Sequence, residues 1–385
     1  MAFVLGTTSG GTGRHVRMLT EGLVKLGHQV LVVGPPSVEE RFAFTGAGAR
    51  FVPVPVSDRP HPLNDARAVL ALRRLTRNAD AVHAHGLRAG ALAALAAPAL
   101  PARGGRAPLV VTLHNALTAG GFVGLVYGTL ERIVARRADR VLVVSPDLGE
   151  RMERLGAGDV RPAVVPAPPL RPARRTPEEV RADLGAGERP IVLTVARLAQ
   201  QKGLENLLDA ARGPWAGGGR ETVTPGASAG PSGESSGRGR PLFVVAGEGP
   251  LREALQRRID AEALPVMLLG ERDDVPDLLA AATVVVWTSR WEGQPLSLSE
   301  TLMAGRPVVA TAVGGIPDLL GGAGRLVPYG DAGALRSAVR ELVEDPRAAA
   351  RMAEAAARRG AELPDAADAV ADVLAGYGKP RSYGR

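Results

Sequence analysis

Short β-rich runs alternate with amphipathic helical stretches along almost the whole chain, and this alternation limits the fold more than any other feature. Strands that read as nearly continuous apolar runs, separated by helices, predict a parallel sheet with helices on both faces. Helices are predicted over 12–26, 63–77 and 122–137. The strands predicted in the first half are 3–7, 29–34, 50–56, 80–86, 109–115 and 140–145.

The second half repeats the same scheme, and a helical, Ala- and Arg-rich tail follows residue 331. The chain has 385 residues, which is too long for one ordinary hydrophobic core. We therefore predict an α/β protein with two doubly wound, Rossmann-like domains. The strands predicted in the second half are 190–196, 242–249, 266–270, 283–289, 307–313 and 324–328.

Composition predicts where the domains begin and end. We expect an N-terminal domain at 1–165, a proline-rich polar linker at 166–189 and a second domain at 190–362. Residues 213–241 are poor in apolar residues and crowded with Gly, Ser and Pro, so they cannot offset the entropy of ordering and are expected to form a disordered insertion. The end of the chain, 363–385, is expected to be a helix and tail that packs back on the N-terminal domain.

The bulk composition excludes several classes of protein. The chain has no cysteine, no apolar run of 18 residues and no basic, then apolar, leader at its N-terminus, so we expect a cytoplasmic protein. Residues 1–165 contain 20 Lys and Arg against 12 Asp and Glu, and this basic half favours a phosphorylated acceptor, an anionic membrane surface or nucleic acid. Because aromatic residues make up only 3% of the chain, nucleic acid is not expected.

In the first half, a glycine-rich turn follows the first predicted strand, and three histidines lie at the C-terminal ends of later ones. The first strand runs into "GTTSGGTGRHV", where backbone N–H groups can face an anion, although a tight packing turn would look the same and no Walker lysine follows. His83, His85 and His114 lie where strands of an open α/β sheet end. No carboxylate motif accompanies the His83–His85 spacing, so no metal site is predicted. His83 reads as structural and His114 as the active-site candidate.

In the second half, two cations flank the turn that opens a helix. Arg197 and Lys202 stand in "VARLAQQKGLENLLDA", directly after a predicted strand. Two cations beside a helix N-terminus suit a diphosphate. A solvated basic loop is the alternative for these residues.

The stretch "WEGQPLSLSE" at 291–300 follows the strand at 283–289. Pro295 is predicted as the first residue of the next helix, so the free N–H groups around it, at 293, 294 and 296, can bind an anion. Glu300, about one and a half turns later, can reach a diol beside that anion, and Glu292 lies in the turn itself. The alternative is a capping glutamate followed by a surface glutamate.

These segments together resemble a family 4 glycosyltransferase of the GT-B fold, a retaining group that uses nucleotide sugars. The resemblance runs through "TSGGTGRHV", "VVTLHN", "LVVSPDL", "VARLAQQKGLENLLDA" and "VVAGEGPL" to "EGQPLSLSETLMAGRPVVATAVGGIPDLL". Glu292 and Glu300 match the family's E-x7-E motif. The resemblance implies two Rossmann-like domains that face each other across a cleft.

The resemblance also implies roles for individual residues. Arg197 and Lys202 would hold the donor diphosphate, Glu300 the ribose, Glu292 the transferred sugar, and His114 the sugar O6 and phosphates. The matching catalytic positions are His114, Glu292, Arg197 and Lys202. The matching donor-binding positions are Gly11, Arg272, Gly293, Gln294, Pro295, Leu296 and Glu300. The acceptor contacts are expected at Gly10, Arg14 and His85.

The implied activity is transfer of a hexosyl unit from a UDP- or GDP-linked sugar, with retention, to a lipid-linked or phosphorylated acceptor of cell-envelope glycoconjugate synthesis. The family reacts on one sugar face without a protein nucleophile, and no DxD motif stands near these residues, so neither a metal nor a cofactor is expected. The basic helix at 63–77 favours such an acceptor and peripheral contact with the inner face of a membrane, and an ordinary solvated Arg-rich helix face is the alternative. The alternatives are a nucleotide-sugar 2-epimerase of the same fold and a non-catalytic sugar-nucleotide-binding protein.

Overall fold

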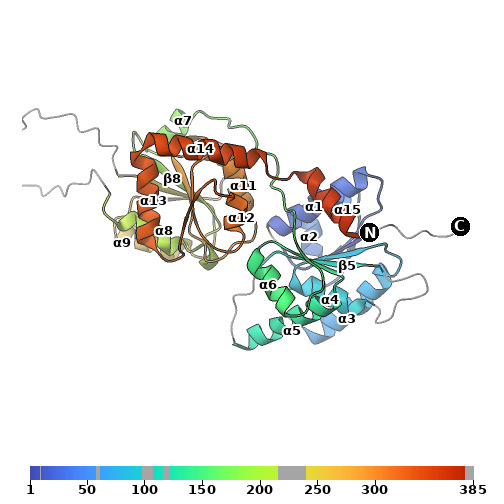
Figure 1. Ribbon diagram of the computed structural model, residues 1–385. Helices are drawn as coiled ribbons and strands as arrows, with labels where there is room; N and C mark the ends of the chain where they lie inside the picture. The colour runs from blue at the N-terminus through green and yellow to red at the C-terminus, as the bar shows by residue number, and fades with distance from the viewer. Residues whose placement is uncertain (9, 58–60, 98–106, 116–120, 216–239, 378–385) are drawn as a thin grey trace, which may run out of the picture. The chain divides into compact units, whose positions relative to one another are not determined.

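The computed structural model describes all residues except 9, 58–60, 98–106, 116–120, 216–239 and 378–385, and it leaves aside the side chains of 121–123. The chain forms two compact units, one of Met1–Pro168 with Pro364–Arg385 and one of Pro169–Leu363. Each unit has its own parallel sheet with helices on both faces (Figure 1). The predicted α/β class with two doubly wound domains is confirmed.

The sheet of the first unit has seven strands in the order β3-β2-β1-β4-β5-β6-β7, and every neighbouring pair is parallel. The strand order reverses beside β1, so the carboxyl ends of β1, β4 and β5 meet at the place where open α/β sheets bind ligands. The strands are β1 Ala2–Leu5, β2 Leu31–Gly34, β3 Arg50–Pro53, β4 Val82–His85, β5 Leu109–Leu113, β6 Arg140–Val143 and β7 Val160–Pro162.

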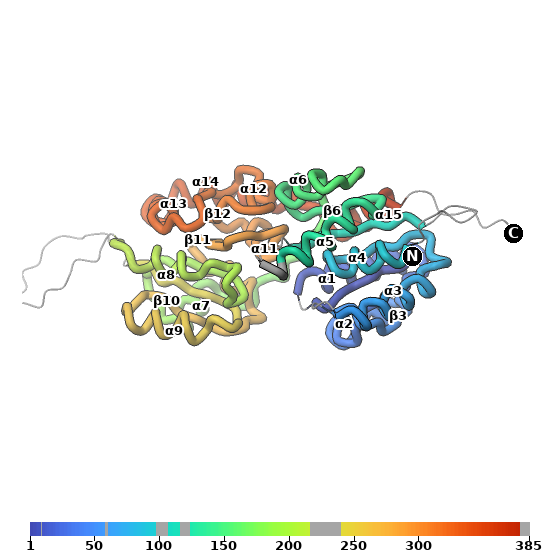
Figure 2. The backbone as a smooth tube through the Cα atoms, turned by 90° about the horizontal axis from the view of Figure 1, so that it is seen from below, coloured from blue at the N-terminus to red at the C-terminus, as the bar shows by residue number. Residues whose placement is uncertain are grey.

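Two layers of helices cover this sheet. Helix α1 (Gly11–Lys25) packs against α2 (Pro36–Phe42) and α15 (Ala366–Tyr377). The other helices of the unit are α3 Pro62–Thr76, α4 Leu87–Ala96, α5 Gly121–Arg137, α6 Pro146–Arg154 and the 3-10 turn η1 Thr45–Ala47. On the other face, α4 lies between α3 and α5, and Figure 2 shows these three helices side by side.

The last helix, α15, belongs to the first unit although it follows the whole second unit in sequence. It packs closely on α1, because a Cβ atom at Gly22 would lie 2.5 Å from Val370. Val370, Val373 and Tyr377 form its buried face. This contact returns the end of the chain to the core that the first residues build.

The sheet of the second unit has six parallel strands in the order β10-β9-β8-β11-β12-β13. Alternate residues of a strand enter different cores: Val192 packs with one and Ile191 and Leu193 with the other. The strands are β8 Ile191–Val195, β9 Leu242–Ala246, β10 Val266–Gly270, β11 Val284–Trp287, β12 Val308–Thr311 and β13 Arg325–Val327.

The two cores of the second unit are closed by different helices. Helices α8 (Leu204–Arg212), α9 (Arg252–Ala261) and α13 (Ala332–Glu344) cover one face. The opposite face is covered by α7 Pro177–Asp183, α10 Val275–Ala281, α11 Leu296–Met303 and α12 Ile316–Leu320, while α14 Pro346–Ala361 contributes to both cores. No helix in the described part of the chain is long and apolar enough to span a membrane.

The predicted linker at 166–189 is wrong over most of its length. Thr176 and Glu179 form a capping box that starts α7, with N–H to side-chain bonds in both directions. Val180 and Leu184 then enter the core of the second unit. The proline-rich composition hid a short amphipathic helix, so the second unit begins soon after residue 168.

Three further features differ from the predictions: the start of the insertion, the first residue of α11 and one edge strand. The expected insertion at 213–241 begins too early, because Trp215 is buried and its Nε1 donates to the carbonyl of Ala211 at 3.2 Å; residues 216–239 lie outside the described part of the chain. Pro295 is the N-cap of α11 instead of its first residue. The edge strand β7 was not predicted, since its three residues are too few to show a pattern.

Candidate active site

The charged candidates of the second unit stand on loops that leave two neighbouring strands. Arg197 follows β8, and the 3-10 turn η2 (Gln200–Lys202) comes next. Glu292 follows β11, which pairs directly with β8. Because parallel strands end at the same edge of the sheet, residues about 90 apart in sequence meet there.

Lys202 and Glu292 form an ion pair at this edge. The ammonium Nζ of Lys202 donates to Oε1 of Glu292 at 2.5 Å, and the hydroxyl of Ser289 donates to the same oxygen at 2.6 Å. Glu292 is only 5% exposed and Ser289 only 1%. A buried carboxylate is costly unless it is paired, so the two donors hold Glu292 as an oriented anion.

The residue after Lys202 has no space for a side chain. Gly203 has a φ of +57°, and a Cβ there would lie 2.2 Å from the carbonyl oxygen of Thr288. The hydroxyl of Thr288 donates to the carbonyl of Lys202 at 3.0 Å, and Nε2 of Gln201 donates to the carbonyl of Trp291 at 2.9 Å. These contacts fix the turn of the lysine against the loop of the glutamate.

A third loop supports the backbone of Glu292. Its carbonyl accepts a hydrogen bond from the N–H of Gly315 at 2.9 Å. Gly314, with a φ of +55°, passes so close that a Cβ would lie 1.9 Å from the same oxygen. The loop after β12 therefore requires glycine at this position.

Helix α11 starts beside the ion pair and places the second glutamate. Its N-cap residue, Pro295, makes no side-chain capping bond to the first N–H groups of the helix, where the positive end of the helix dipole lies. Glu300 lies in the second turn and is half-buried. Arg197 is exposed and makes neither an ion pair nor a side-chain hydrogen bond among the described residues.

Arg272 has a different environment from the one expected of a base-binding residue. Its guanidinium forms two hydrogen bonds with Asp274, at 2.7 and 2.6 Å, and Asp274 also pairs with Arg175. These bonds lower the pKa of the Asp274 carboxyl. A contact of Arg272 with a base stays a prediction.

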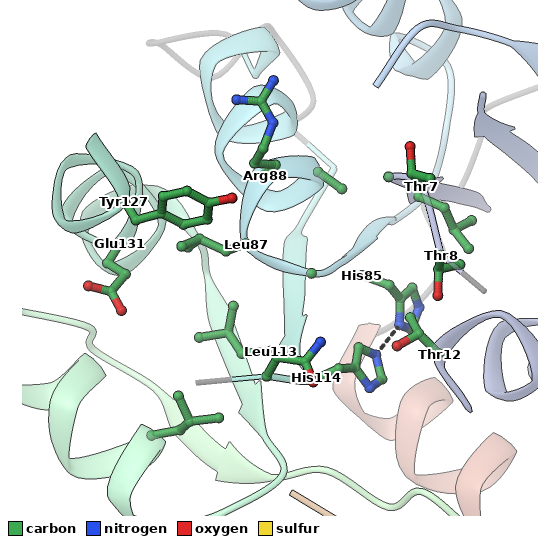
Figure 3. Close-up of a pocket in the computed structure, with 16 residues that line it drawn as sticks. Thr7, Thr8, Thr12, His85, Leu87, Arg88, Leu113, His114, Tyr127 and Glu131 are labelled. Atoms are coloured by element: carbon green, nitrogen blue, oxygen red, sulfur yellow. Dashed lines mark hydrogen bonds between the residues drawn. The ribbon is translucent and has the colours of Figure 1, made fainter. Parts of the chain in front are cut away.

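The first unit contains a cavity of about 280 Å³ at the carboxyl end of its central strands. Figure 3 shows that its walls come from the turn after β1, the end of β4 with the start of α4, the end of β5, and α5. The polar side chains on these walls are Thr7, Thr8, Thr12, His85, Arg88, His114, Asn115, Tyr127 and Glu131.

The two charged side chains of the cavity wall are already paired. Arg88 donates to the carboxylate of Asp65 at 2.7 Å and to the carbonyl of Ser57 at 2.6 Å. Glu131, 4% exposed, accepts two hydrogen bonds from Arg151, at 2.7 and 2.6 Å. The cavity therefore offers hydroxyls, an amide and imidazoles, with the charges of Arg88 and Glu131 neutralised.

His85 and His114 line the cavity, and His15 and His83 pack against His85. Burial lowers the pKa of His114 to about 4, and burial together with the neighbouring His114 lowers that of His83 to about 3. Burial also holds the pKa values of His15 and His85 well below the ordinary value. All four imidazoles are therefore neutral at pH 7.

The predicted acceptor residues lie near one another at the start of α1 and on β4. Gly10 is the N-cap of α1, Gly11 its first residue, and Arg14 is exposed one turn further along. His85 lines the cavity, but both of its ring nitrogens are enclosed. The acceptor roles of these residues stay predictions.

Sequence reasoning missed several residues of these sites. Ser289 stands where a strand ends, the same position that identified the histidines, and could have been found by that rule. Glu131, Tyr127 and Tyr377 lie on helices with no local pattern that distinguishes them. Only the tertiary structure shows that these three residues lie at the cavity or the histidine cluster.

Both halves of the chain are similar to known protein families. Residues 10–168 match the family model described as "Glycosyl transferase 4-like domain", and residues 234–345 match "Glycosyl transferases group 1". Alpha-D-kanosaminyltransferase of Streptomyces kanamyceticus is 30% identical over 382 residues, which cover 89% of this chain and 92% of that protein. The chain is a family 4 glycosyltransferase of the GT-B fold.

A further relative of this glycosyltransferase supports the family, and a solved structure supports the fold. The 2-deoxystreptamine N-acetyl-D-glucosaminyltransferase of Streptomyces fradiae is 32% identical over 306 residues, covering 72% of this chain and 66% of the relative. Among solved structures, Anabaena HepE in complex with UDP superposes with a TM-score of 0.77 at 20% identity, over 97% of this chain and 98% of HepE. That similarity is one of fold.

Proposed function

We propose that this glycosyltransferase moves a hexosyl unit from a UDP- or GDP-linked donor to a hydroxyl of its acceptor, with retention of configuration and without a metal ion. The observation that carries the proposal is the ion pair of Lys202 and Glu292 beside the uncapped start of α11. Arg197, unpaired among the described residues, adds a second cation at the same strand edge.

In this proposal the protein acts mainly on the leaving diphosphate. Negative charge develops on the diphosphate as the glycosidic bond breaks, and Arg197, Lys202 and the first N–H groups of α11 stabilise it. The two cations supply the charge compensation that a metal supplies in other transferases. The diphosphate then takes the proton of the acceptor hydroxyl on the same face of the sugar, so no protein nucleophile is required.

The two glutamates divide the recognition of the donor. Glu300 accepts hydrogen bonds from the ribose diol, because a carboxylate can accept a pair of bonds from vicinal hydroxyls. Glu292, oriented by Lys202 and Ser289, accepts from a hydroxyl of the transferred sugar. His114 donates to the sugar or to a phosphate oxygen.

A thermal-shift panel tests the donor site. UDP, GDP and their hexose conjugates are added in EDTA to the wild type and to Glu300→Gln, with Glu341→Gln on the exposed face of α13 as the matched control. A ligand at 100 times its Kd stabilises by about 2.7 kcal/mol. We expect one nucleotide to stabilise the wild type and the control but much less the Glu300 variant. Stabilisation only after Mg²⁺ or Mn²⁺ is added would refute metal independence.

The cavity of the first unit supports binding of a neutral, hydroxyl-rich group of the acceptor. Its charges are paired, and Thr7 and Thr12 offer hydroxyls. With a donor identified, product analysis by proton NMR on polyhydroxylated and on phosphorylated acceptors tests this assignment. The coupling constant of the new anomeric proton tests retention. An inverted linkage would exclude the same-face mechanism.

Helix α3 supports a lipid-linked or phosphorylated acceptor and peripheral contact with an anionic membrane. Arg67, Arg74 and Arg77 are exposed without an ion pair among the described residues, and Leu63 and Leu70 on the same stripe are 69% and 58% exposed. Such a stripe suits a surface of anionic lipids. Cosedimentation with vesicles that contain phosphatidylglycerol should fall when the three arginines become glutamine. The exposed set Arg154, Arg257 and Arg358, changed in the same way, is the control.

The alternatives make different predictions in the same assays. An epimerase would consume the donor without an acceptor, and a non-catalytic protein would bind the donor without turnover. A non-catalytic protein does not need the diphosphate cations Arg197 and Lys202 to act on a leaving group, so the pair favours an enzyme over a binding protein.

A further inference from the structure

All six histidines of the chain lie within its first 114 residues, and four of them gather in the core of the first unit. The ring centroids of His83 and His85 are 4.2 Å apart, those of His85 and His114 5.4 Å, and His15 lies 5.8 Å from His85 and from His114. They come from α1, β4 and the end of β5. His114 has a stated role in transfer, but His85 has none that its geometry supports directly.

The hydrogen bonds within the cluster separate the four rings. His83 has partners on both nitrogens, the hydroxyl of Tyr377 and that of Thr112, each at 2.7 Å. Nδ1 of His85 is hydrogen-bonded to Nε2 of His114 at 3.1 Å, and Figure 3 marks this contact beside the cavity. His85 therefore touches His114, and His114 lines the cavity.

The remaining nitrogen of His85 indicates where its proton lies. A neutral imidazole has one N–H and one lone pair, so one ring of the His85–His114 contact donates and the other accepts. Nε2 of His85 is buried and has no partner among the described residues. A buried N–H without an acceptor is rarer and costlier than a bare lone pair. The proton of His85 therefore belongs on Nδ1, from which it donates to Nε2 of His114.

This assignment determines the state of His114. Because its Nε2 accepts, its own proton must lie on Nδ1. Among the described residues Nδ1 of His114 has no hydrogen-bond partner, and it is not one of the fully enclosed polar atoms. It is the nitrogen that remains available to a molecule in the cavity.

We propose that His85 is a positioning residue that locks His114 as its Nδ1–H tautomer, so that His114 presents a neutral N–H donor to an oxygen of the bound substrate. The identity of that substrate rests on the proposed function, but the tautomer does not. With its pKa lowered to about 4 by burial, His114 is a hydrogen-bond donor at pH 7 and does not act as a cation. The titratable groups that face His85 are His15 on α1, His83 on its own strand and His114.

Long-range ¹H–¹⁵N correlation spectra of the full chain labelled with ¹⁵N-histidine test the proposal. Only six imidazoles contribute, and single His→Asn variants assign them. We expect His114 to carry its proton on Nδ1 and His85 to carry its proton on Nδ1 at pH 7. A wild-type spectrum with the His114 proton on Nε2, or with His114 protonated at pH 7, would overturn the proposal without any variant.

Two substitutions of His85 separate positioning from packing. His85→Asn places an amide where Nδ1 stood and should keep the His114 tautomer. His85→Leu removes the bond and should return His114 toward the Nε2–H form that free imidazole prefers. His83→Leu, a buried imidazole lost from the same strand, is the control and should leave the His114 signals in place. Equal changes in the His83 and His85 variants would show a packing effect and refute the proposal.

Kinetics supply a second readout. Turnover is measured with whichever UDP- or GDP-linked hexose the wild type binds, in the presence of the acceptor that the product analysis identifies. We expect His85→Leu to lower kcat about tenfold, the value of one well-placed hydrogen bond, with KM little changed, and His85→Asn to recover most of it. A change in KM alone would refute the positioning role. If no nucleotide sugar is turned over, the transfer proposal fails, while the spectrum still decides the tautomer.

Discussion

The two units use the same parallel topology to build sites of opposite electrostatic character. In the first unit, the carboxyl ends of β1, β4 and β5 surround neutral histidines and a cavity whose charges are paired. In the second, the ends of β8 and β11 hold Arg197, Lys202 and Glu292 beside an uncapped helix. The fold supplies the position at which side chains meet, and the residues on the loops decide whether that position is polar and neutral or charged.

The comparison also separates two ways of holding a functional side chain. His114 is held by another imidazole in a buried cluster, where no ion pair is needed. Glu292 is held by a cation and a hydroxyl, since a carboxylate buried at 5% exposure requires compensation. Disruption of the two sites should therefore have different signatures in activity, stability and pH dependence.

Loss of the lysine should have the largest effect. Lys202→Ala removes a diphosphate cation and leaves Glu292 unpaired, so we expect kcat/KM to fall at least about a hundredfold. Stability should fall as well, because a buried charge has lost its partner. Steady-state kinetics and urea unfolding measure the two effects. Lys25→Ala, on the exposed face of α1, is the control.

The double variant Lys202→Met with Glu292→Gln distinguishes charge compensation from catalysis. It removes both charges while keeping similar volumes, so most of the lost stability should return and activity should not. Recovery of activity together with stability would show that the lysine has only a structural role.

Acidification should weaken the first unit before the second. A histidine whose folded pKa lies below its ordinary value of 6.5 binds more protons when unfolded, so its contribution is complete above pH 6.5 and is lost as pH falls toward the folded pKa. For His114 and His83 that window runs from 6.5 to about 4 and about 3. Each such histidine adds a slope of about 1.4 kcal/mol per pH unit.

The chain offers a separate probe for each unit in this experiment. All six histidines lie in the first unit, whereas the three tryptophans, Trp215, Trp287 and Trp291, lie in the second. Histidine NMR and tryptophan fluorescence should therefore give urea midpoints that diverge between pH 7 and pH 5. Midpoints that move together would contradict the assignment of the acid sensitivity to the histidine cluster.

A glycine substitution tests the charged site through its backbone. Gly314→Ala would force a Cβ against the carbonyl of Glu292, whereas Gly330→Ala, also at positive φ (+84°), meets nothing within 4 Å. The control should lose about 1 kcal/mol from φ alone, and Gly314→Ala should lose more and also weaken donor binding. Calorimetry with the bound nucleotide measures both. Equal losses in the two variants would mean that the close approach to Glu292 has relaxed without cost.

The smallest effect is expected at the end of the chain. Tyr377→Phe removes the hydroxyl that pairs with His83 and should cost about 1 kcal/mol of the first unit's stability. Tyr329→Phe, at a 40% exposed tyrosine, is the control and should change nothing measurable. Chemical unfolding followed by histidine NMR gives both values. An unchanged Tyr377→Phe midpoint would exclude a stabilising link between α15 and β4.

The chain's own pattern predicted the two parallel sheets, most helices, and the loop positions of His114, Arg197, Lys202 and Glu292. These features are local, since period-two and period-3.6 patterns and strand ends can be read within a few residues. The prediction of a linker at 166–189 was wrong, because the proline content of the segment was given more weight than the helix-capping signal of Thr176 and Glu179.

Tertiary structure alone decided which side chains meet. The bond between His83 and Tyr377 joins residues 294 apart, and the pair of Lys202 and Glu292 joins residues 90 apart. Such contacts depend on strand order and helix packing, which no local period encodes. The neutral state of the histidines follows from that same packing, because burial is the largest cause that lowers their pKa values. The sequence determined the sheets and the loops, and packing determined the chemistry of the sites.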